Sequence, residues 1–522
     1  MIILAKKALI SVYDKTGIED FAAGLKKFDY QIVSTGGTAE KLRKTGVDVL
    51  DVSEITDYPE MMGGRVKTLH PAIHGALLAV RDNEEHMNEI GDMGIEPIDM
   101  VVVNLYPFAE TISKEGVTLE EALENIDIGG PTMIRSAAKN FRDVIVVTDP
   151  EDYEDVLNEM AENEGDILIS TRRELAMKAF RLTSGYDQII TDFLEEKREK
   201  FPRELHSVYR KENNLRYGEN PHQEAAFYRD EMSREPSIAG ASKLHGKDLS
   251  FNNINDADAA LEIIKEFDPP AAVVIKHTNP CGLAVASDIT TAYRKAQAGD
   301  PVSAFGSIVA LNRKVIAATA EEITGPDRFV EVIIAPEYEE EALRILKERW
   351  EDIRILQIPE LSQGIPEEMR DQYEFKQVTG GLLLQDRNLP VYSQQKLQVV
   401  SRKKPEDREL KELLFAWQAV KHVKSNAIVI ARDQSLVGVG AGQMSRVDAM
   451  DIAASKAGER SQGAVVASDA FIPFRDVVDR AAAAGIGAII QPGGSIRDEE
   501  VVAAADDLGM IMVFTDFRHF RH

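Results

Sequence analysis

The sequence is poor in cysteine, in long apolar runs and in positive charge. Its single cysteine, Cys281, excludes an internal disulfide and a Cys-x-x-Cys metal site, so structural zinc is not expected. No apolar run approaches the roughly 20 residues that a membrane-spanning helix needs. The opening segment MIILAKKALISVYDK reaches the charged Asp14 too early for a signal peptide. These absences predict a cytoplasmic protein.

Positive charge is scarce, because 61 Lys and Arg face 88 Asp and Glu, a formal net charge of −27. Such a field repels nucleic acid and anionic membranes, so neither is an expected partner. An anionic small molecule would need local clusters of Lys and Arg or helix N-termini. Such clusters occur at 64–71 (GRVKTLHP), 134–140 (IRSAAKN) and 274–280 (VIKHTNP), although solvated surface side chains are their ordinary explanation.

The length of 522 residues predicts two or three domains, and 44% hydrophobic with 29% charged residues is typical of a globular enzyme. Near the start, apolar runs with β-branched residues at 8–14 and 31–37 flank a helical pattern at 17–28. Further apolar runs follow at 100–106 and 143–149. This alternation predicts an α/β fold with a Rossmann-like parallel sheet and helices on both faces, closed by the helix-rich sequence that follows.

The charged segment 194–207, which contains Pro202, is the best linker candidate. We therefore place an N-terminal domain at 1–198 and a C-terminal domain at 199–522. The second region is again α/β, either one larger domain or two similar lobes, and no fixed-period repeat is visible. Its expected strands lie at 271–277, 307–312, 331–336, 426–431, 435–442, 488–494 and 510–516.

Polar loops in the first domain predict an anion-binding site. STGGT (34–38) ends a strand and opens a helix, where glycine N–H groups can approach a phosphate, although it matches neither G-x-G-x-x-G nor the Walker pattern. Arg65 and Lys67 lie in a glycine-flanked loop, and Asp127 precedes a second Gly-Gly turn with Lys139 on the helix after it. Asp, Lys and Tyr together can transfer protons in an intramolecular condensation without metal or cofactor. For each residue alone, a cap or a solvated side chain is the ordinary alternative.

KHTNPCG (276–282) is the main chemical motif of the second region. It follows an apolar strand, so we expect Lys276 and His277 at the strand's carboxyl end, where α/β proteins bind ligands. A histidine there titrates near neutrality and can shuttle a proton, whereas a lone histidine is more often structural. GVGAG (438–442) lacks a clearly placed acidic residue about twenty positions further on, so NAD binding is a poor interpretation.

Longer motifs resemble two known enzyme families. The first domain contains SVYDKTG, STGGTAEKL, GGRVKTLHP, NLYPF, NIDIGGP and AAKN, which resemble the inosine monophosphate (IMP) cyclohydrolase domain with its methylglyoxal-synthase-like fold. The second contains RYGENPHQ, KHTNPCG, DPVSAFG, KSNAIV, GAGQMSR, SDAFIPF and QPGGSIRD, which resemble the aminoimidazole carboxamide ribonucleotide (AICAR) formyltransferase domain with its two cytidine-deaminase-like lobes. The resemblance runs from Ser11 to His522 and implies the last two steps of IMP synthesis. These are formyl transfer from 10-formyltetrahydrofolate to the 5-amino group of AICAR, giving FAICAR, and dehydrative closure of FAICAR to IMP.

The resemblance also implies roles for particular residues. Lys276 and His277 are the expected formyl-transfer pair, His277 taking the proton from the attacking amino group. The implied catalytic set of the cyclohydrolase is Lys67, Tyr106, Asp127 and Lys139. Its implied nucleotide contacts are Tyr13, Asp14, Lys15, Thr35, Gly36, Gly37, Thr38, Arg65, Thr68, Val103, Asn104 and Ile128. The implied ribonucleotide contacts of the transformylase are Arg216, Tyr217, Asn253, Gly306, Glu331, Asn426, Arg446, Phe471 and Arg518, and its folate contacts are Val447, Ser495 and Ile496.

Three positions depart from the family pattern. Tyr13 replaces a serine of some members, Ser136 interrupts a frequent triple alanine, and Glu331 stands where others have Asp. The resemblance implies a homodimer and, without the His-x-Glu and paired cysteines of zinc deaminases, no metal for either reaction. A phosphate-lyase of the methylglyoxal-synthase type, or a regulatory ligand-binding protein, would share only the first domain's fold and would explain less than half of the chain.

Overall fold

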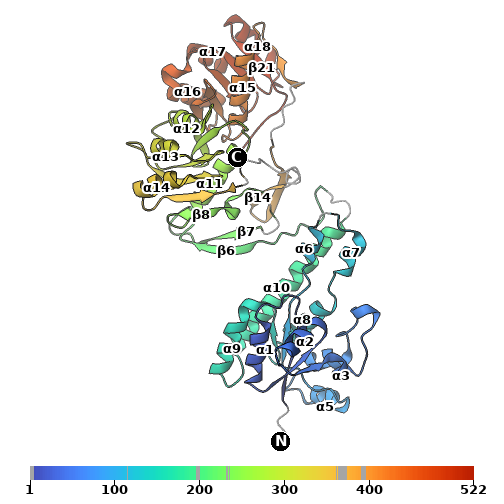
Figure 1. Cartoon of the computed structure of the whole chain (residues 1–522). Coiled ribbons are helices and arrows are strands. Elements are labelled where there is room, and N and C mark those ends of the chain that lie inside the picture. The colour runs from blue at the N-terminus through green and yellow to red at the C-terminus, as the bar shows by residue number, and fades with distance from the viewer. Residues whose placement is uncertain are drawn as a thin grey trace. The chain divides into compact units, whose positions relative to one another are not determined.

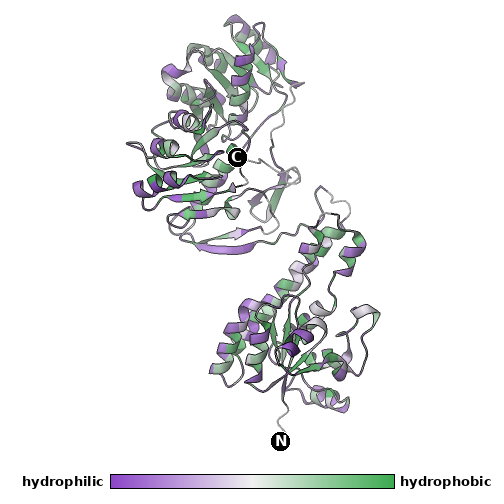
Figure 2. Cartoon of the chain, viewed as in Figure 1, coloured by the Kyte–Doolittle hydropathy of each residue, from purple (hydrophilic) through white to green (hydrophobic). Residues whose placement is uncertain are grey.

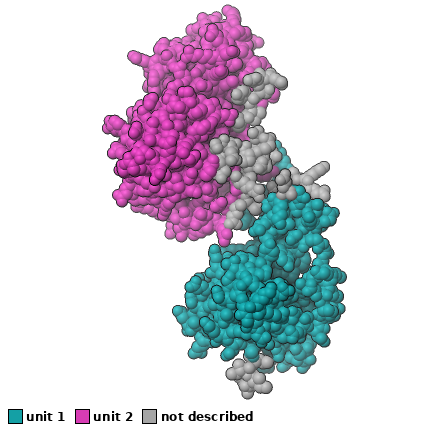
Figure 3. Space-filling view, in the orientation of Figure 1, with its two compact units in different colours: residues 1–208 teal, residues 209–522 magenta. Residues whose placement is uncertain are grey.

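The computed structural model describes residues 5–114, 116–195, 200–230, 233, 235–359, 361, 373–389 and 396–522. Contacts divide the chain into two compact units, Met1–Val208 and Tyr209–His522, which we call the first and second units (Figure 3). The boundary expected between 198 and 199 lies outside the described residues, since 196–199 are not among them. No helix in the described part of the chain is long and apolar enough to cross a membrane.

The first unit is built on a five-stranded parallel sheet of order β3-β2-β1-β4-β5 (Figure 1). Its strands are β1 (Lys6–Ser11), β2 (Tyr30–Ser34), β3 (Val49–Asp51), β4 (Met100–Val103) and β5 (Ile145–Val147). Every residue of β4 and β5 is buried, as expected when helices cover both faces of a parallel sheet. The parallel sheet is therefore confirmed, although the three-residue β3 was not predicted.

Helices alternate with these strands, so the apolar runs and helical patterns of the sequence fall where they were expected. Helix α1 (Ile18–Lys26) packs against α9 (Tyr153–Glu162). Helix α8 (Gly129–Lys139) packs against both α4 (Pro71–Leu78) and α10 (Ile169–Leu194). The remaining α-helices are α2 (Gly36–Lys44), α3 (Val52–Thr56), α5 (Glu84–Asp92), α6 (Phe108–Ile112) and α7 (Leu119–Glu124).

The strand order of the first unit positions its site. The chain passes outward from β1 to β3, then returns to place β4 on the other side of β1. The loops after β1 and β4 therefore run away from each other, and this divergence leaves a crevice at the carboxyl ends of the strands.

The second unit contains two six-stranded mixed sheets. The first has the order β10-β9-β11-β12-β13-β8 and consists of β8 (Ser242–His245), β9 (Ala271–Lys276), β10 (Asn279–Val285), β11 (Ser307–Leu311), β12 (Val330–Ala335) and β13 (Arg354–Gln357). The second has the order β16-β21-β20-β19-β17-β18 and consists of β16 (Gln398–Val399), β17 (Ile428–Ala431), β18 (Leu436–Gly440), β19 (Val465–Ser468), β20 (Ala488–Gln491) and β21 (Ile511–Phe514). All seven predicted strands of this region are present.

The two sheets have the same topology, which confirms the interpretation of two similar lobes. Each lobe runs through an edge strand, a 14-residue helix, an antiparallel hairpin and then further strands joined by helices. The first lobe contains α11 (Phe251–Ile264), α12 (Ile289–Gln297), α13 (Ala317–Ile323) and α14 (Glu340–Arg349), and the second contains α15 (Asp407–Val420), α16 (Arg446–Ala457), α17 (Asp476–Ala483) and α18 (Asp498–Asp507). One apolar cluster includes residues of α11, α15 and both sheets, so the lobes share a core. Figure 2 shows the corresponding apolar strands inside more polar helices.

Two further antiparallel hairpins belong to the second unit and were not predicted. They are formed by β6 (Arg210–Leu215) with β7 (Ala225–Arg229) and by β14 (Tyr373–Val378) with β15 (Gly381–Asp386). Most of their residues are exposed or half-buried, so they lack the apolar periodicity from which the core strands were recognised.

The fragment of residues 1–208 is expected to fold by itself. Its sheet and helices form an apolar core that runs from Ala8 to Ala179 and contains no residue of the second unit. Thermal unfolding followed by circular dichroism should therefore show one cooperative transition for this fragment. A fragment that melts without cooperativity and binds a hydrophobic dye would contradict this prediction.

Candidate functional sites

A cavity of about 690 Å³ lies at the crevice of the first unit. Residues after β1, β2 and β4 line it, together with the N-terminal turns of α2 and α8. The predicted site residues that line it are Tyr13, Lys15, Thr35, Gly36, Gly37, Thr38, Arg65, Lys67, Thr68, Val103, Asn104, Tyr106, Asp127 and Ile128. Segments that are up to about a hundred residues apart in the sequence thus meet in one cavity.

Two predicted residues of the first unit do not line this cavity. The backbone N–H of Asp14 donates to Asn104 Oδ1 (3.0 Å), and its carboxylate accepts from the Thr16 backbone and hydroxyl. Lys139 is exposed at the last position of α8. It lies ten residues beyond Gly129, which is about 15 Å at the rise of an α-helix.

One end of the cavity is suited to an anion. Helix α2 begins there without a side-chain cap, so its first N–H groups are available to a ligand, and Gly36 adopts the left-handed φ of 55° that favours glycine. Lys15, Arg65 and Lys67 add cations. Lys67 Nζ lies 3.0 Å from Glu60 Oε2, and Arg65 pairs with Glu124. The uncapped start of α2 and Lys15 therefore favour an anion here, while Glu60 and Glu124 offset the charges of Lys67 and Arg65.

Asp127 is held at the start of α8. Its Oδ1 accepts from the Gly130 N–H (2.8 Å), and its own N–H donates to the Tyr186 hydroxyl (2.8 Å). Burial raises the pKa of Asp127, opposed by hydrogen bonds from the backbone of Gly130 and Tyr106. A Cβ at Gly130 would lie 2.5 Å from Asp127 Oδ2, so glycine is required for this close approach. A carboxyl whose pKa is raised takes up a proton more readily than an exposed one, which suits proton transfer.

Aromatic side chains complete this cavity. The rings of Tyr13 and Tyr106 make an edge-to-face contact at 5.7 Å, and both are about half exposed. Tyr186, on α10, was not predicted, although its hydroxyl accepts from Asp127 and donates to the Asn125 carbonyl (3.3 Å). A tyrosine within a helical pattern is typical of a core position, so the sequence held no signal for this role.

In the first lobe, Lys276 ends β9 and its Nζ donates to the carbonyls of Phe305 (3.1 Å) and Gly306 (2.8 Å). Glu331 Oε2 accepts from the buried Asn253 (3.0 Å). Because β9 is antiparallel to β11 and β11 is parallel to β12, the carboxyl end of β9 meets the amino ends of the other two strands. Lys276, Gly306, Glu331 and Asn253 are thereby brought together.

KHTNPCG spans the turn between β9 and β10 and the start of β10. His277 and Thr278 are the two turn residues of a hairpin, and β10 begins at Asn279, which pairs with Lys276. The imidazole of His277 is exposed. The sequence lacks the Asn-Gly or Asp-Gly pair that marks most two-residue hairpins, so this turn was not predicted.

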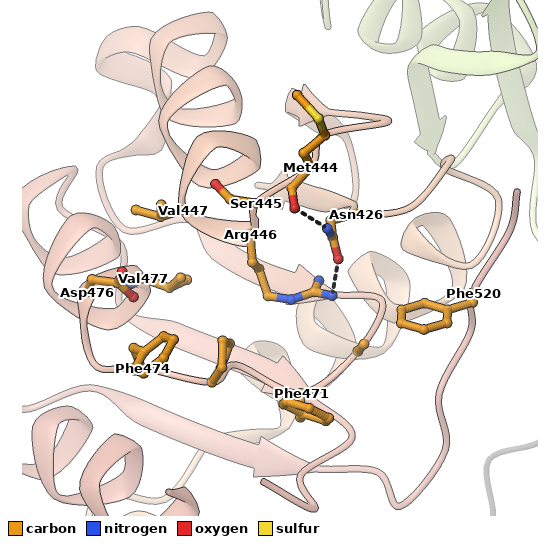
Figure 4. Close-up of a pocket in the computed structure, with 12 residues that line it drawn as sticks. Asn426, Met444, Ser445, Arg446, Val447, Phe471, Phe474, Asp476, Val477 and Phe520 are labelled. Atoms are coloured by element: carbon orange, nitrogen blue, oxygen red, sulfur yellow. Dashed lines mark hydrogen bonds between the residues drawn. The ribbon is translucent and has the colours of Figure 1, made fainter.

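The second lobe contains a cavity of about 390 Å³ (Figure 4). Arg446, at the start of α16, donates to Asn426 Oδ1 (2.8 Å) and Ser468 Oγ (2.8 Å) and pairs with the fully buried Asp469. Asn426 in turn donates to the Met444 carbonyl (3.2 Å). The predicted residues that line this cavity are Asn426, Arg446, Val447 and Phe471.

Three further predicted residues, Ser495, Ile496 and Arg518, lie close to the second-lobe cavity. The guanidinium of Arg497 stacks on Phe474 at 4.8 Å, which places the loop of Ser495 and Ile496 beside the second-lobe cavity. Arg518 stacks on Phe520, another lining residue, at 4.4 Å.

Arg216 and Tyr217 stack on each other at 5.5 Å in the loop after β6. The Glu219 carbonyl of this loop accepts from Asn252 of α11 (3.3 Å), beside Asn253. The first-lobe group and the second-lobe cavity are linked by the Lys424 N–H, which donates to Asn279 Oδ1 (3.0 Å).

Phe474, Asp476 and Phe520 also line the second-lobe cavity and were not predicted. Phe474 belongs to the SDAFIPF motif and Asp476 follows two residues later, so the signal was present but only Phe471 was taken from it. Within the described ranges, no group of three or more His, Cys, Asp and Glu side chains is arranged to hold a metal ion.

Comparison with known proteins gives matches over nearly the whole chain. The family model of the AICARFT/IMPCHase bienzyme matches residues 137–456, and that of the MGS-like domain matches residues 17–132. The chain is 54% identical to the bifunctional purine biosynthesis protein PurH of Magnetococcus marinus, with 99% of each chain covered. It is 52% and 51% identical to the proteins of that name from Acetivibrio thermocellus and Bacillus cereus, with 99% of this chain and 100% of each relative covered. A solved structure described as "Crystal structure of ForH" is 36% identical and covers 36% of this chain and 98% of its own, with a TM-score of 0.33.

Asp127→Asn is expected to raise the thermal stability of the first unit at neutral and alkaline pH. Because burial raises the folded-state pKa of Asp127, its protonated form stabilises the fold, and that contribution is lost as pH rises through the folded-state pKa. The amide keeps an oxygen for the Gly130 N–H and carries no charge. Unfolding midpoints measured between pH 4 and 8 should show a gain that grows with pH.

The control for this experiment is Glu89→Gln, which neutralises an exposed carboxyl on α5 and should change the midpoint little. An Asp127→Asn variant that is less stable than the parent protein across the whole range would show that the fold stabilises the charged carboxylate.

Proposed function

The chain belongs to the AICARFT/IMPCHase bienzyme family, and we propose how its two units divide the two reactions of that bienzyme. The chain is a bifunctional enzyme of IMP synthesis. We assign dehydrative closure of FAICAR to IMP to the first-unit cavity. We assign formyl transfer from 10-formyltetrahydrofolate to AICAR to the two lobes of the second unit. The observation that best supports this assignment is that most of the residues named by the two sets of motifs gather in separate units.

In the first unit, the nucleotide phosphate binds at the N-terminus of α2 beside Lys15 and Arg65. Ring closure joins the carboxamide nitrogen to the formyl carbon, and the formyl oxygen departs as water. Lys67 stabilises the charge that develops on this oxygen, while Asp127 and Tyr106 exchange protons with the reacting groups. Burial raises the pKa of Asp127 above that of an exposed carboxyl, which favours its taking up and returning a proton. The role of Lys139 rests on the sequence motif alone.

In the second unit, His277 accepts the proton that the 5-amino group of AICAR loses as it attacks the formyl carbon. Lys276 supports the developing negative charge, since its ammonium group lies at the neighbouring strand end. The ribonucleotide is bound by the residues on both lobes that the motifs identify. These are Arg216, Tyr217, Asn253, Gly306, Glu331, Asn426, Arg446, Phe471 and Arg518.

10-Formyltetrahydrofolate binds at the second-lobe cavity. Phe474 presents an apolar face there that suits a flat heteroaromatic ring, and Val447 lines the wall, whereas Asn426, Arg446 and Phe471 of the same cavity contact the ribonucleotide. Ser495 and Ile496 lie beside it, and Asp476 provides a carboxylate for ring N–H groups. The protein acts as a homodimer on these small molecules, and neither reaction uses a metal.

Lys67→Ala is expected to abolish or severely reduce cyclisation and to leave formyl transfer close to that of the parent protein, because the residues act in separate units. Lys139→Ala is expected to do the same if the motif-based role holds. Cyclisation of FAICAR and formylation of AICAR should be measured on the same preparations. Loss of both activities together with a lowered melting temperature would assign a structural role to the residue replaced.

His277→Ala is expected to reduce formyl transfer by on the order of 10²–10⁴-fold, the usual contribution of a general base. AICAR binding should be retained better than turnover, and cyclisation of FAICAR should be unchanged. Steady-state rates with 10-formyltetrahydrofolate from pH 6 to 9 test this. Near-normal formylation across that range would show that the proton leaves by another route.

A further inference from the structure

The hairpin turn that presents His277 has an unfavourable backbone conformation. His277 and Thr278 adopt φ values of 52° and 61°, in the left-handed region. A β-branched residue such as threonine rarely adopts this region, because its branched Cβ crowds the backbone. Such conformations persist only where surrounding groups enforce them.

One carboxylate binds both turn residues. Asp256 on α11 accepts from the Thr278 N–H with Oδ1 (2.7 Å) and from the His277 N–H with Oδ2 (3.3 Å). The opposite side of the turn is held through the His277 carbonyl, which accepts from the Thr278 hydroxyl (2.7 Å) and from Asn279 Nδ2 (2.9 Å). The Asp256 carboxyl is half-buried, and burial raises its pKa against these hydrogen bonds.

The second lobe repeats this arrangement without a histidine. Its hairpin turn consists of Asp433 and Gln434, each with a φ of 52°. The Gln434 N–H donates to both carboxylate oxygens of Glu412 (2.9 and 3.0 Å). Glu412 is the sixth residue of α15, as Asp256 is of α11. In both lobes, therefore, a carboxylate on a helix binds the backbone of the hairpin turn. Only the turn of the first lobe contains a histidine, His277.

We propose that Asp256 is a positioning residue for formyl transfer, which fixes the direction of the His277 imidazole by binding the backbone of its turn. The inference rests on the proposed role of His277 as the base. The φ and ψ of a residue set the direction of its Cα–Cβ bond, so a relaxed turn would swing the imidazole away from the amino group. A displacement of about 1 Å at a reacting group can lower the rate by on the order of 10²-fold.

Asp256→Asn tests this, because the amide keeps one acceptor but turns an NH₂ group toward a backbone N–H. The kcat of formyl transfer should fall by on the order of 10–10²-fold. The KM for AICAR should change little, since Asn253, Gly306 and Arg446 are untouched. Cyclisation of FAICAR should be that of the parent protein.

Glu412→Gln is the matched control. It weakens the equivalent turn, and the Gln434 carbonyl of that turn accepts from Val285 at the far end of β10. The seven residues of β10 separate this point from His277 by about 20 Å. Glu412→Gln should therefore leave formyl transfer unchanged.

Thr278→Gly in the Asp256→Asn background separates positioning from general stability. Glycine adopts a φ near 60° without strain, so one of the two left-handed residues no longer needs the carboxylate, and part of the lost kcat should return even though the bond from the Thr278 hydroxyl is removed. A normal kcat in Asp256→Asn, or a loss that Glu412→Gln reproduces and Thr278→Gly does not restore, would overturn the inference. If the His277→Ala variant formylates AICAR normally, the proposed role of His277 as the base is wrong. That failure can be told apart from a failure of the Asp256 inference, because the variant leaves Asp256 unchanged.

Discussion

The shared apolar core around α11 and α15 is the constraint on which the second unit depends. Both helices belong to one buried cluster with the strands of both sheets, so the lobes cannot separate without exposing apolar surface to water. Helix α11 supplies Asn253 and Asp256 to the first-lobe site, and the chain leaving α15 forms the segment of Lys424 and Asn426 that borders the second-lobe cavity. The packing that stabilises the unit therefore also sets the geometry of its sites.

Charged groups in this core are paired. Buried Lys265, which follows α11, donates to Glu235 (2.7 Å) and Glu262 (2.8 Å), and Arg387 donates to Glu262 (2.7 Å). Removing one partner of such a pair leaves an uncompensated buried charge, which costs about 3–5 kcal/mol. This network joins the end of α11 to Glu235 and to Arg387, which lies 125 residues from Glu262, and so ties the position of α11, which bears Asp256, to these two segments.

The protein carries a large negative charge and is proposed to bind anions. These two properties are compatible because cationic side chains and a helix N-terminus lie directly at the proposed anion site. A net charge of −27 describes the field at a distance, whereas a bound phosphate responds to groups within a few ångströms. The first-unit cavity combines the uncapped start of α2 with Lys15, Arg65 and Lys67. Glu60 and Glu124 pair with Lys67 and Arg65, and so hold these long side chains in place at the cavity.

The sequence by itself determined the features that depend on local pattern. Seven of the twelve strands in the two six-stranded sheets were predicted, because apolar β-branched runs are recognisable without knowledge of their partners, whereas β8, β10, β13, β16 and β19 were not. The cavity residues were named from motifs that resemble a known family. Tertiary structure alone decided which strands pair, that His277 lies on a hairpin turn and that Lys139 lies at the far end of α8 from the cavity. It also decided the roles of Tyr186, Asp256 and Phe520, whose contacts join residues of separate elements. The physical reason is that strand register and helix packing are set by the burial of surfaces contributed by distant segments, and no local window of sequence contains both surfaces.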